Sequence, residues 1–354
     1  MIRSLRVVDF RCFETLALDV PEGGAVFTGD NAQGKTSILE AVCVLVRLHS
    51  PRTRKMQTMV RMKSTGGFGV AGEAWDMARK VRWQRGLNLT TDEETRSGPG
   101  VYLADGGLIV WMGNEDLDLV RGSAEGRRHY LDFIGSQIEP GYRQALSRYR
   151  RAMKVKNLLL KDTRPREEEI RSYEEIMISN GDFLTSARSR LVEMVSPRAA
   201  RAQREVSGRD EQLTLEYRSA GGGDLRTALE QAHERERRQR QSVVGPHRDD
   251  LLLSINGLAA AEFASEGQQR TLALALKLAQ GEALAEVRGT LPVYLIDDIF
   301  GELDPGRRNA VLRVLPAAAQ KWITTTNLGW LDESQGLGKM ARFNVVNGTV
   351  APVE

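Results

Sequence analysis

The chain has 354 residues, of which 41% are hydrophobic, and a formal net charge of only +3; this length allows two domains or one domain with a large insertion. Two cysteines, Cys12 and Cys43, exclude a disulfide scaffold and fit a reducing compartment. Because the N-terminus has no signal-peptide pattern and no segment has the ~18 consecutive apolar residues of a membrane span, we expect a soluble cytoplasmic protein with no membrane partner.

The first part of the chain combines a β pattern with a phosphate-binding motif. Residues 3–20 alternate loosely, which predicts strands before a turn at 21–24. A short apolar strand at 25–28 then precedes GDNAQGKT (29–36), and a buried helix is predicted at 37–46. The motif matches G-x-x-x-x-G-K-[ST] between a strand and a helix, where backbone N–H groups and the helix N-terminus attract a polyphosphate.

The motif predicts ATP and Mg²⁺ as cofactors. We expect Lys35 to reach the β- and γ-phosphates and Thr36 to offer its hydroxyl to the metal. The alternative, a chance match in a glycine-rich turn, is disfavoured by the flanking strand and helix. The residues expected to contact the nucleotide from this loop are Gly29, Asp30, Asn31, Ala32, Gln33, Gly34, Lys35, Thr36 and Ser37.

A basic segment follows the predicted helix. Residues 41–72 carry six basic side chains and no acidic one, which suits contact with a phosphate backbone, although a solvated loop explains it equally well. Residues 68–111 contain short alternating segments, among them VYLADGGLIVW with an Asp105-Gly106 turn signal. They predict an antiparallel sheet beside the first strand–helix unit.

The middle of the chain is polar, charged and helical in pattern. Residues 113–242 hold 25 Lys/Arg and 22 Asp/Glu, so the formal positive excess lies there. Within this segment, 143–161 has seven basic residues and no acid, which fits a helix that faces DNA or a solvated one. We expect 113–242 to be a helical insertion (lobe II) in an α/β head (lobe I) formed by 1–112 and 243–354.

Strand signals return toward the C-terminus. LPVYLI (291–296) is continuously apolar, as a central parallel strand is, KWITTT (321–326) predicts another strand, and FNVVNGTV (343–350) has the Asn-Gly of a hairpin. The first of these strands ends in two carboxylates, on a strand expected to neighbour that of the P-loop. We expect Asp297 to hold Mg²⁺ and Asp298 to polarise an attacking water, with two merely solvated acids as the alternative.

A second anion-binding pattern occurs at SEGQQ (265–269), which opens an apolar helix. Ser265 offers a hydroxyl, Gly267 lets a backbone approach closely, and the helix N-terminus adds positive potential. One nucleotide has one γ-phosphate, so this site is surplus in a monomer but useful if it caps the nucleotide of a second copy across a two-fold axis. An ordinary N-cap by Ser265 is compatible with this interpretation.

These motifs resemble those of the ABC-type ATPases, with 265–269 as the signature motif, Asp297 and Asp298 as Walker B, and Leu303-Asp304 as the D-loop. Within that class the chain resembles the RecF family of DNA replication and repair proteins. The residues that carry this resemblance are SPRT (50–53), NEDLDLVRGSAEGRRHYLDFIGSQI (114–138), LSRYRRAMKVKNLLLK (146–161), GPHRDDLLLSINGLAAAEFASEGQQRTLALALKLAQGEAL (245–284), LIDDIFGELD (295–304) and WITTTNL (322–328).

The resemblance implies an ATP-dependent homodimer that binds DNA and releases it on hydrolysis. Such proteins act on single-stranded and linear double-stranded DNA and on gap junctions, and with RecR and RecO they help RecA onto DNA in recombinational repair. Carried over by position, Lys35, Asp298 and Ser265 are the catalytic residues, and Gln268 joins Ser265 and Gly267 in the signature motif. Arg11 lies where the family has an arginine near the nucleotide.

Two departures from the wider class affect the expected mechanism. No glutamine stands in the segment that corresponds to the Q-loop, so Asn114 or Glu115 is the candidate replacement. The general base is an aspartate, one methylene shorter than glutamate, which predicts slow turnover suited to a switch. The resemblance implies a weak, DNA-dependent ATPase. In GPHRDD, we expect His247 and Arg248 to lie at the dimer or nucleotide edge.

Three other function classes fit the motifs less well. An SMC-type chromosome-organising ATPase needs coiled-coil arms tens of nanometres long, for which the insertion is too short at ~1.5 Å per residue. The nucleotide-binding subunit of a transporter usually carries a Leu-Ser-Gly-Gly-Gln signature and a switch histidine, where Ala264 and Asn327 stand here. A simple kinase leaves the 265–269 motif unexplained.

Overall fold

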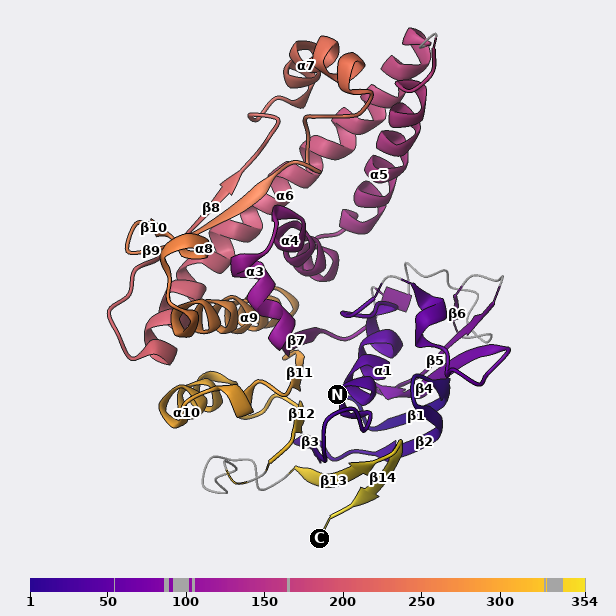
Figure 1. The fold of residues 1–354 in the computed structure, drawn as a ribbon, viewed down its shortest axis with the longest axis vertical. Helices are drawn as coiled ribbons and strands as arrows, with labels where there is room; N and C mark the ends of the chain where they lie inside the picture. The colour runs from indigo at the N-terminus through magenta and orange to yellow at the C-terminus, as the bar shows by residue number, and fades with distance from the viewer. Residues whose placement is uncertain are drawn as a thin grey trace. The chain divides into compact units, whose positions relative to one another are not determined.

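The computed structural model describes residues 1–53, 55–85, 89–91, 102–103, 106–163, 166–327, 329 and 340–353. The chain divides into two compact units, one formed by Met1–Asn114 with Gln280–Glu354 and the other by Glu115–Ala279 (Figure 1). Trp330 and the Asp105 turn signal lie outside the described residues. Among the helices that the structure describes, none has both the length and the hydrophobicity required to cross a bilayer.

The first unit contains two sheets and few helices. Its elements are β1 (Ser4–Phe10), β2 (Phe13–Asp19), β3 (Gly24–Thr28), α1 (Lys35–Arg47), the 3-10 helix η1 (Met56–Met59), β4 (Gly67–Ala74), β5 (Met77–Gln84), β6 (Thr90–Thr91), β7 (Ile109–Gly113), β11 (Val293–Asp297), the 3-10 helix η3 (Phe300–Glu302), α10 (Pro305–Val314), β12 (Lys321–Thr325), β13 (Ala341–Val346) and β14 (Thr349–Pro352).

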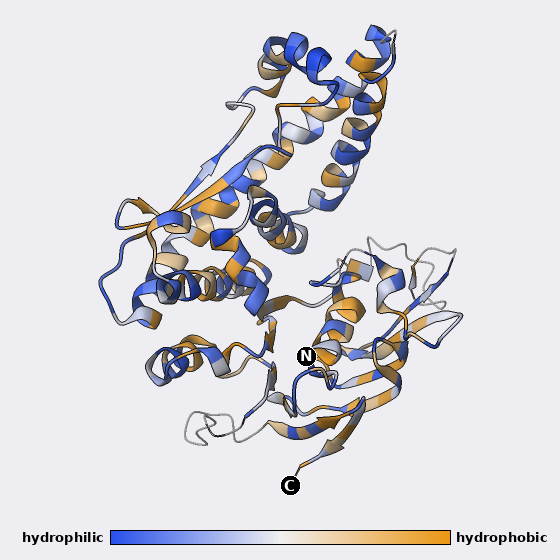
Figure 2. Cartoon of the chain, viewed as in Figure 1, coloured by the Kyte–Doolittle hydropathy of each residue, from blue (hydrophilic) through white to orange (hydrophobic). Residues whose placement is uncertain are grey.

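The two sheets enclose the helix that follows the P-loop. One sheet has the order β2-β1-β4-β5-β6 and is antiparallel, and the other has the order β14-β13-β3-β12-β11-β7 and is parallel except at β14. Helix α1 packs against β1, β4 and β5 of the first sheet and against β7, β11 and β12 of the second. Its residues are buried on all sides, and the apolar colouring of α1 in Figure 2 matches this position.

Two expectations about strand placement are wrong. Residues 109–113 do not join the antiparallel sheet: they form β7, which pairs in parallel with β11 and is buried throughout, as its unbroken apolar sequence allows. The strand that ends in the paired carboxylates is also not next to the P-loop strand. β12 lies between β11 and β3, so its side chains stand between the two motifs.

The second unit is mainly helical. Its elements are the 3-10 helix η2 (Asn114–Leu117), α3 (Asp118–Arg121), α4 (Ala124–Ile138), α5 (Tyr142–Leu159), α6 (Glu167–Ser207), β8 (Leu213–Arg218), α7 (Leu225–Gln239), β9 (Asp250–Ile255), β10 (Leu258–Ala259), α8 (Ala260–Phe263) and α9 (Glu266–Arg288), whose last residues belong to the first unit.

The helices of the second unit pack on a small sheet. α5 and α6 share the most extensive helix–helix contact, and Tyr142, Tyr149, Met177, Leu184 and Leu229 are among the side chains that form its core. β8 pairs with β9, and β9 pairs with β10, in antiparallel register. Figure 2 shows that α7 is largely polar, in keeping with the high charge of this part of the chain.

The boundary between the units differs from the expected one on its C-terminal side. The insertion was expected to end at residue 242, but 243–279 belong to the second unit. The reason is the strand β8, which the helical pattern of the middle segment conceals. It pairs with β9 from Leu213↔Ile255 to Arg218↔Asp250 and so ties the chain after 242 to the inserted unit.

Candidate functional site

The P-loop runs from the end of β3 to the start of α1 and is held by its own lysine. The Lys35 ammonium donates hydrogen bonds to the carbonyl oxygens of Gly29 (2.5 Å) and Asp30 (2.8 Å). Gly34 has φ 112°, and a Cβ there would lie 2.5 Å from the Cys12 sulfur, so glycine is required on both counts. Ala32 also has a positive φ of 64°, which gives the loop its tight curvature.

Three hydroxyl and carboxyl groups from separate strands and helices converge beside this loop. The Thr36 hydroxyl, at the start of α1, donates to Asp297 Oδ1 at 2.8 Å, and the Thr324 hydroxyl of β12 donates to the same oxygen at 2.7 Å. Thr36 and Asp297, the two residues predicted to hold Mg²⁺, are thus brought together. Thr324, which sequence reasoning missed, bridges them because β12 separates their strands; the polar end of the WITTT strand is the signal that could have revealed it.

Asp298 leaves the strand with an unusual backbone. Its φ of 52° lies in the left-handed region, which Asp and Asn tolerate better than most residues. Its N–H donates to the Thr324 hydroxyl at 3.0 Å, so the backbone turn is anchored. Its Oδ1 is buried and accepts no hydrogen bond from the residues that the structure describes. A buried carboxylate oxygen without a donor is costly and calls for a donor from elsewhere, such as a water molecule.

The electrostatics of this corner suit a polyphosphate with a divalent cation. Burial lowers the pKa of Lys35, and the negative charges of Asp298, Asp297 and Asp30 oppose that shift. Within the described part of the chain, no group of three or more His, Cys, Asp and Glu side chains could hold a metal by itself. In P-loop sites, Mg²⁺ is bound by one or two protein side chains together with substrate phosphates and water.

The C-terminal hairpin supports the P-loop. The turn between β13 and β14 donates two backbone hydrogen bonds to Gln33, from Asn347 N to Oε1 (2.6 Å) and from Gly348 N to the carbonyl oxygen (3.2 Å). The side-chain oxygen of Gln33 is therefore engaged with the hairpin, and the predicted contact of Gln33 with the nucleotide stays a prediction. Ser37, predicted for the same role, is buried in the first turn of α1.

Arg11 forms an ionic contact with Glu40, which lies one turn after Thr36 on the same face of α1. Its guanidinium donates to both carboxylate oxygens of Glu40 (2.7 and 2.6 Å) and to the Thr58 carbonyl (2.7 Å). Glu40 is fully buried and also accepts from the Ser50 hydroxyl at 2.5 Å. These contacts hold Arg11 one turn of α1 beyond Thr36, and they engage its guanidinium with groups outside the P-loop. Asn114, the candidate Q-loop residue, donates to Glu302 at 2.9 Å.

The signature segment belongs to the second unit and forms a capping box at the start of α9. Ser265 Oγ accepts from the Gln268 N–H at 3.3 Å, while Gln268 Oε1 accepts from the Ser265 N–H at 2.8 Å. The Gln268 amide also donates to buried Glu211 at 3.0 Å. Gly267 lies in the first turn, where its carbonyl accepts from Thr271. Ser265 is exposed, so the helix N-terminus is accessible in this unit.

The second glutamine of this segment has a structural role that the sequence did not suggest. Gln269 is buried; its oxygen accepts from Arg121 Nε at 2.5 Å and its amide donates to the carbonyls of Ala260 and Ala264 (3.2 and 3.1 Å). These bonds fix the short helix α8 against the first turn of α9. The signature segment is therefore a rigid structure before any partner binds.

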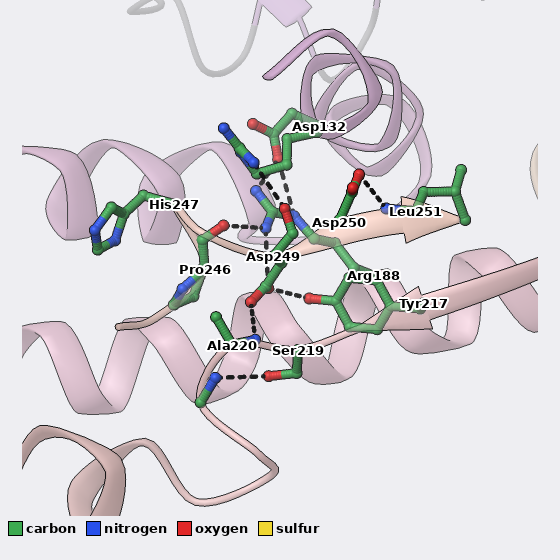
Figure 3. Close-up of polar contacts among 12 residues, drawn as sticks. Asp132, Arg188, Tyr217, Ser219, Ala220, Pro246, His247, Asp249, Asp250 and Leu251 are labelled. Atoms are coloured by element: carbon green, nitrogen blue, oxygen red, sulfur yellow. Dashed lines mark hydrogen bonds and ion pairs between the residues drawn. The ribbon is translucent and has the colours of Figure 1, made fainter. Parts of the chain in front are cut away.

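The GPHRDD segment is the centre of a buried polar network in the second unit (Figure 3). Asp249 is fully buried and accepts from the Ala220 N–H (2.8 Å), the Tyr217 hydroxyl and the Arg188 guanidinium (3.3 Å). Arg188 also donates to Asp132 at 2.8 Å. Every charge in this set has an opposite charge or a hydrogen-bond partner, so the set acts as scaffold.

His247 also points into this unit. Its Nε2 contacts the Ser242 carbonyl at 3.1 Å and must carry the proton, so Nδ1 accepts from the Tyr149 hydroxyl at 2.7 Å. Burial, with Arg248 and Arg128 nearby, lowers the pKa of His247 to about 4. The imidazole is therefore neutral at pH 7 and packs inside the second unit, where we expected it at a dimer or nucleotide edge.

Comparison with known proteins identifies the family, although no protein-family model matches the sequence. A DNA replication and repair protein RecF from Shouchella clausii is 31% identical over 100% of both chains. The chain belongs to the RecF family. A second RecF, from Thermosynechococcus vestitus, is 34% identical over 99% of this chain and 97% of its own length.

Solved structures agree with this assignment. The recombination mediator protein RecF-ATP in the RecFOR pathway superimposes with a TM-score of 0.87 at 26% identity, over 100% of this chain and 97% of that one. An Smc head domain from Pyrococcus furiosus matches with a TM-score of 0.55 at 14% identity, which shows the shared fold alone. The α/β head of ABC-type ATPases with an inserted helical lobe, expected from the sequence, is confirmed.

Proposed function

We propose that this RecF-family protein is a DNA-binding ATPase that works as a switch in the repair and replication of gapped DNA. It binds ATP with Mg²⁺, dimerises through the nucleotide, holds DNA as the dimer, and releases it after slow hydrolysis. It acts in the cytoplasm, with RecR and RecO, to help RecA onto DNA. The family assignment and the name of the matched structure, RecF-ATP in the RecFOR pathway, support the nucleotide and the pathway.

The convergence of Thr36, Asp297 and Thr324 carries the ATPase part of this proposal. A threonine hydroxyl at the start of the P-loop helix meets the Walker B carboxylate at 2.8 Å, which is the pair that holds Mg²⁺ in P-loop NTPases. When bound, the metal would neutralise charge that develops on the phosphates. Thr324 keeps Asp297 in place, since its hydroxyl donates to the same oxygen.

The remaining residues of this corner have separable roles. Lys35 donates hydrogen bonds to two loop carbonyls, and with a nucleotide bound its ammonium would donate to the β- and γ-phosphates. Asp298 has a buried oxygen that needs a donor, and a water that donates to it would be oriented and polarised for attack. The aspartate is shorter than the glutamate of many ABC ATPases, which fits a slow switch.

The accessible, preformed N-terminus of α9 supports a composite site between two copies. Its Ser265 hydroxyl and first-turn N–H groups form an anion-binding end whose geometry is fixed by Gln268 and Gln269. The same chain also has a P-loop, so two copies related by a two-fold axis would each complete the other's site. SMC-like architecture is the alternative, but the longest described helix, α6, has 41 residues and spans only about 62 Å.

The decisive experiment compares DNA binding and size-exclusion behaviour with ATP and with ADP. We expect wild type to dimerise and bind duplex DNA only with ATP, and Lys35→Met to lose ATP binding and both responses. Ser265→Arg should retain ATP binding but lose dimerisation and DNA binding. Ser172→Arg, at an exposed serine of α6, is the matched control and should behave as wild type. Normal dimerisation of Ser265→Arg would disprove the composite site.

The general-base role is tested by Asp298→Asn, which keeps the left-handed backbone and removes the charge. We expect single-turnover ATP hydrolysis to fall by about 100-fold, because general-base catalysis contributes about 10² to 10⁴. ATP affinity and ATP-dependent dimerisation should persist. An unchanged hydrolysis rate would remove Asp298 from the mechanism without affecting the DNA-binding proposal.

A further inference from the structure

The outer face of the antiparallel sheet in the first unit contains a groove that the nucleotide site does not use. It runs along β4, which lies between its neighbours β1 and β5 in the sheet (Figure 1). We refer to it as the β4 groove and define it by a floor of Gly67, Gly69 and Ala71 and walls of Arg6, Lys80 and Arg82.

The strand register explains why the floor is bare. Gly69 lies between Val8 of β1 and Arg82 of β5, and Ala71 lies between Arg6 and Lys80. The alternate residues of β4, Phe68 and Val70, are buried on the opposite face against the core. Small residues therefore occupy each outward position along the middle of β4. Lys80 and Arg82 border them on the β5 side, and Arg6 and the exposed Val8 border them on the β1 side.

The wall on the β5 side is basic and accessible. Lys80 and Arg82 are both exposed and stand two residues apart on β5, so their backbones are about 6.8 Å apart. Arg6 borders the other side, with 44% of its side chain exposed. One of its guanidinium nitrogens is paired with Asp19 at 2.6 Å, which offsets part of its charge.

We propose that the β4 groove binds the sugar–phosphate backbone of DNA. The spacing of Lys80 and Arg82 is close to that of successive phosphates along a nucleic-acid strand, and cationic side chains of this kind supply most of the affinity for DNA. The floor lets a backbone approach the sheet closely. The groove is two strand spacings wide, about 9.6 Å, so it admits one strand of a duplex. This inference deepens the DNA binding proposed above and depends on it.

An acidic peptide is the main rival occupant, and the sheet topology disfavours it. Peptides bind sheets most effectively as an added strand at an edge. β4 is an inner strand that is paired on both sides, with β1 and with β5. Its N–H and C=O groups are used within the sheet, so an extended peptide would gain no backbone pairing there. Charge and close approach, which suit a phosphate backbone, are what the groove can offer.

The test uses full-length protein with ATP and a fluorescent duplex, titrated at several salt concentrations. Neutralising both cations in Lys80→Gln/Arg82→Gln should weaken binding on the order of tenfold and reduce the salt slope by about 1.8, at ~0.9 for each phosphate that the protein no longer neutralises. Arg313→Gln, at an exposed arginine of α10, is the control and should leave both values unchanged.

A second variant separates local contact from long-range charge. A Cβ at Gly69 would meet only Val8, at 4.0 Å, so the position has room for a Cβ, and Gly69→Val would fill the floor without changing charge. We expect it to weaken DNA binding several-fold while ATP-dependent dimerisation stays normal.

The outcomes separate this inference from the proposed function. If wild type binds DNA but both groove variants bind as wild type does, the β4 groove is not a DNA contact and the proposed function stands. If wild type binds no DNA with any nucleotide, the proposed function is disproved, and the groove proposal, which depends on it, is disproved with it. A labelled polyglutamate peptide that binds wild type but not Gly69→Val, with DNA affinity unchanged, would assign the groove to an acidic partner and overturn the proposal.

Discussion

The P-loop corner of the first unit and the Arg188 network of the second unit both bury charged groups, but they complete them differently. Around Arg188, carboxylates, hydroxyls and N–H groups satisfy one another, and Asp249 alone has three donors. At the P-loop corner, Asp298 Oδ1 is buried with no donor among the described residues, and Lys35 is desolvated near three carboxylates. The comparison teaches that a satisfied network builds a scaffold, whereas an incomplete one is suited to a ligand.

The stabilities of the two units can be measured with separate spectroscopic signals. All five tryptophans lie in the segments of the first unit, so their fluorescence follows its unfolding. The long helices α5 and α6 lie in the second unit, so far-UV circular dichroism is weighted toward that unit. Urea titrations read by both signals report the two stabilities separately.

The largest expected effect is on the network of the second unit. Arg188 is 2% exposed and contacts Asp132 and Asp249, so Arg188→Met leaves the buried Asp249 carboxylate without its cation and leaves Asp132 with Arg150 alone. We expect the free energy of unfolding, read by circular dichroism, to fall by about 3–5 kcal/mol.

The control for this change lies two residues along the same helix. Arg190 is 51% exposed and pairs with Glu139 at 2.8 Å, so Arg190→Met should cost less than about 1 kcal/mol. Equal losses for the two variants would show that the Arg188 network is not a scaffold.

This network marks the limit of what the sequence could predict. The P-loop was recognisable because its residues are contiguous and its chemistry is local, and Asp297 followed because an apolar strand led into it. Arg188 and Asp249 are 61 residues apart, and the pairing of β8 with β9 that brings them together depends on a strand hidden in a helical pattern. The sequence pattern alone does not predict contacts between residues this far apart in the chain.

The same reasoning applies to the residues of the candidate site. Thr324 could be seen as polar at a strand end, but its place between Asp297 and the P-loop depends on the sheet order. The backbone turn at Asp298 is a tertiary effect, since the strand pattern alone predicts a simple alternation of the two acids. Gln33 resembles the rest of the loop in sequence, and only the hairpin turn shows that its side chain is engaged.

An intermediate loss of unfolding free energy is expected when the pH is lowered, because His247 is buried as a neutral group. Its pKa is about 4 when folded, and the ordinary value near 6.5 applies when unfolded. Between these values the unfolded chain binds a proton that the folded chain excludes, so this contribution is complete above pH 6.5 and is lost as the pH falls toward 4. Wild type should lose about 2 kcal/mol from this group between pH 7 and pH 5.

The matched variant is His247→Gln, which retains a donor and an acceptor but does not titrate. Its unfolding free energy, read by circular dichroism, should fall less between the two pH values, by about the 2 kcal/mol assigned to the imidazole. If wild type and His247→Gln lose the same stability on acidification, the histidine is not buried as a neutral group and its place inside the second unit is disproved.

The smallest effect on stability is expected at Asp298 of the P-loop corner, where a ligand would complete the network. Asp298→Asn removes a buried charge that lacks a donor but also removes an attraction to Lys35, so the two changes oppose each other. The unfolding free energy read by tryptophan fluorescence should change by less than about 1 kcal/mol. Asp297→Ala should cost about 1–3 kcal/mol, because two threonine hydroxyls lose their acceptor. If Asp298→Asn destabilises the first unit as much as Asp297→Ala does, Asp298 is a structural residue, and the contrast between an incomplete site and a complete scaffold does not hold.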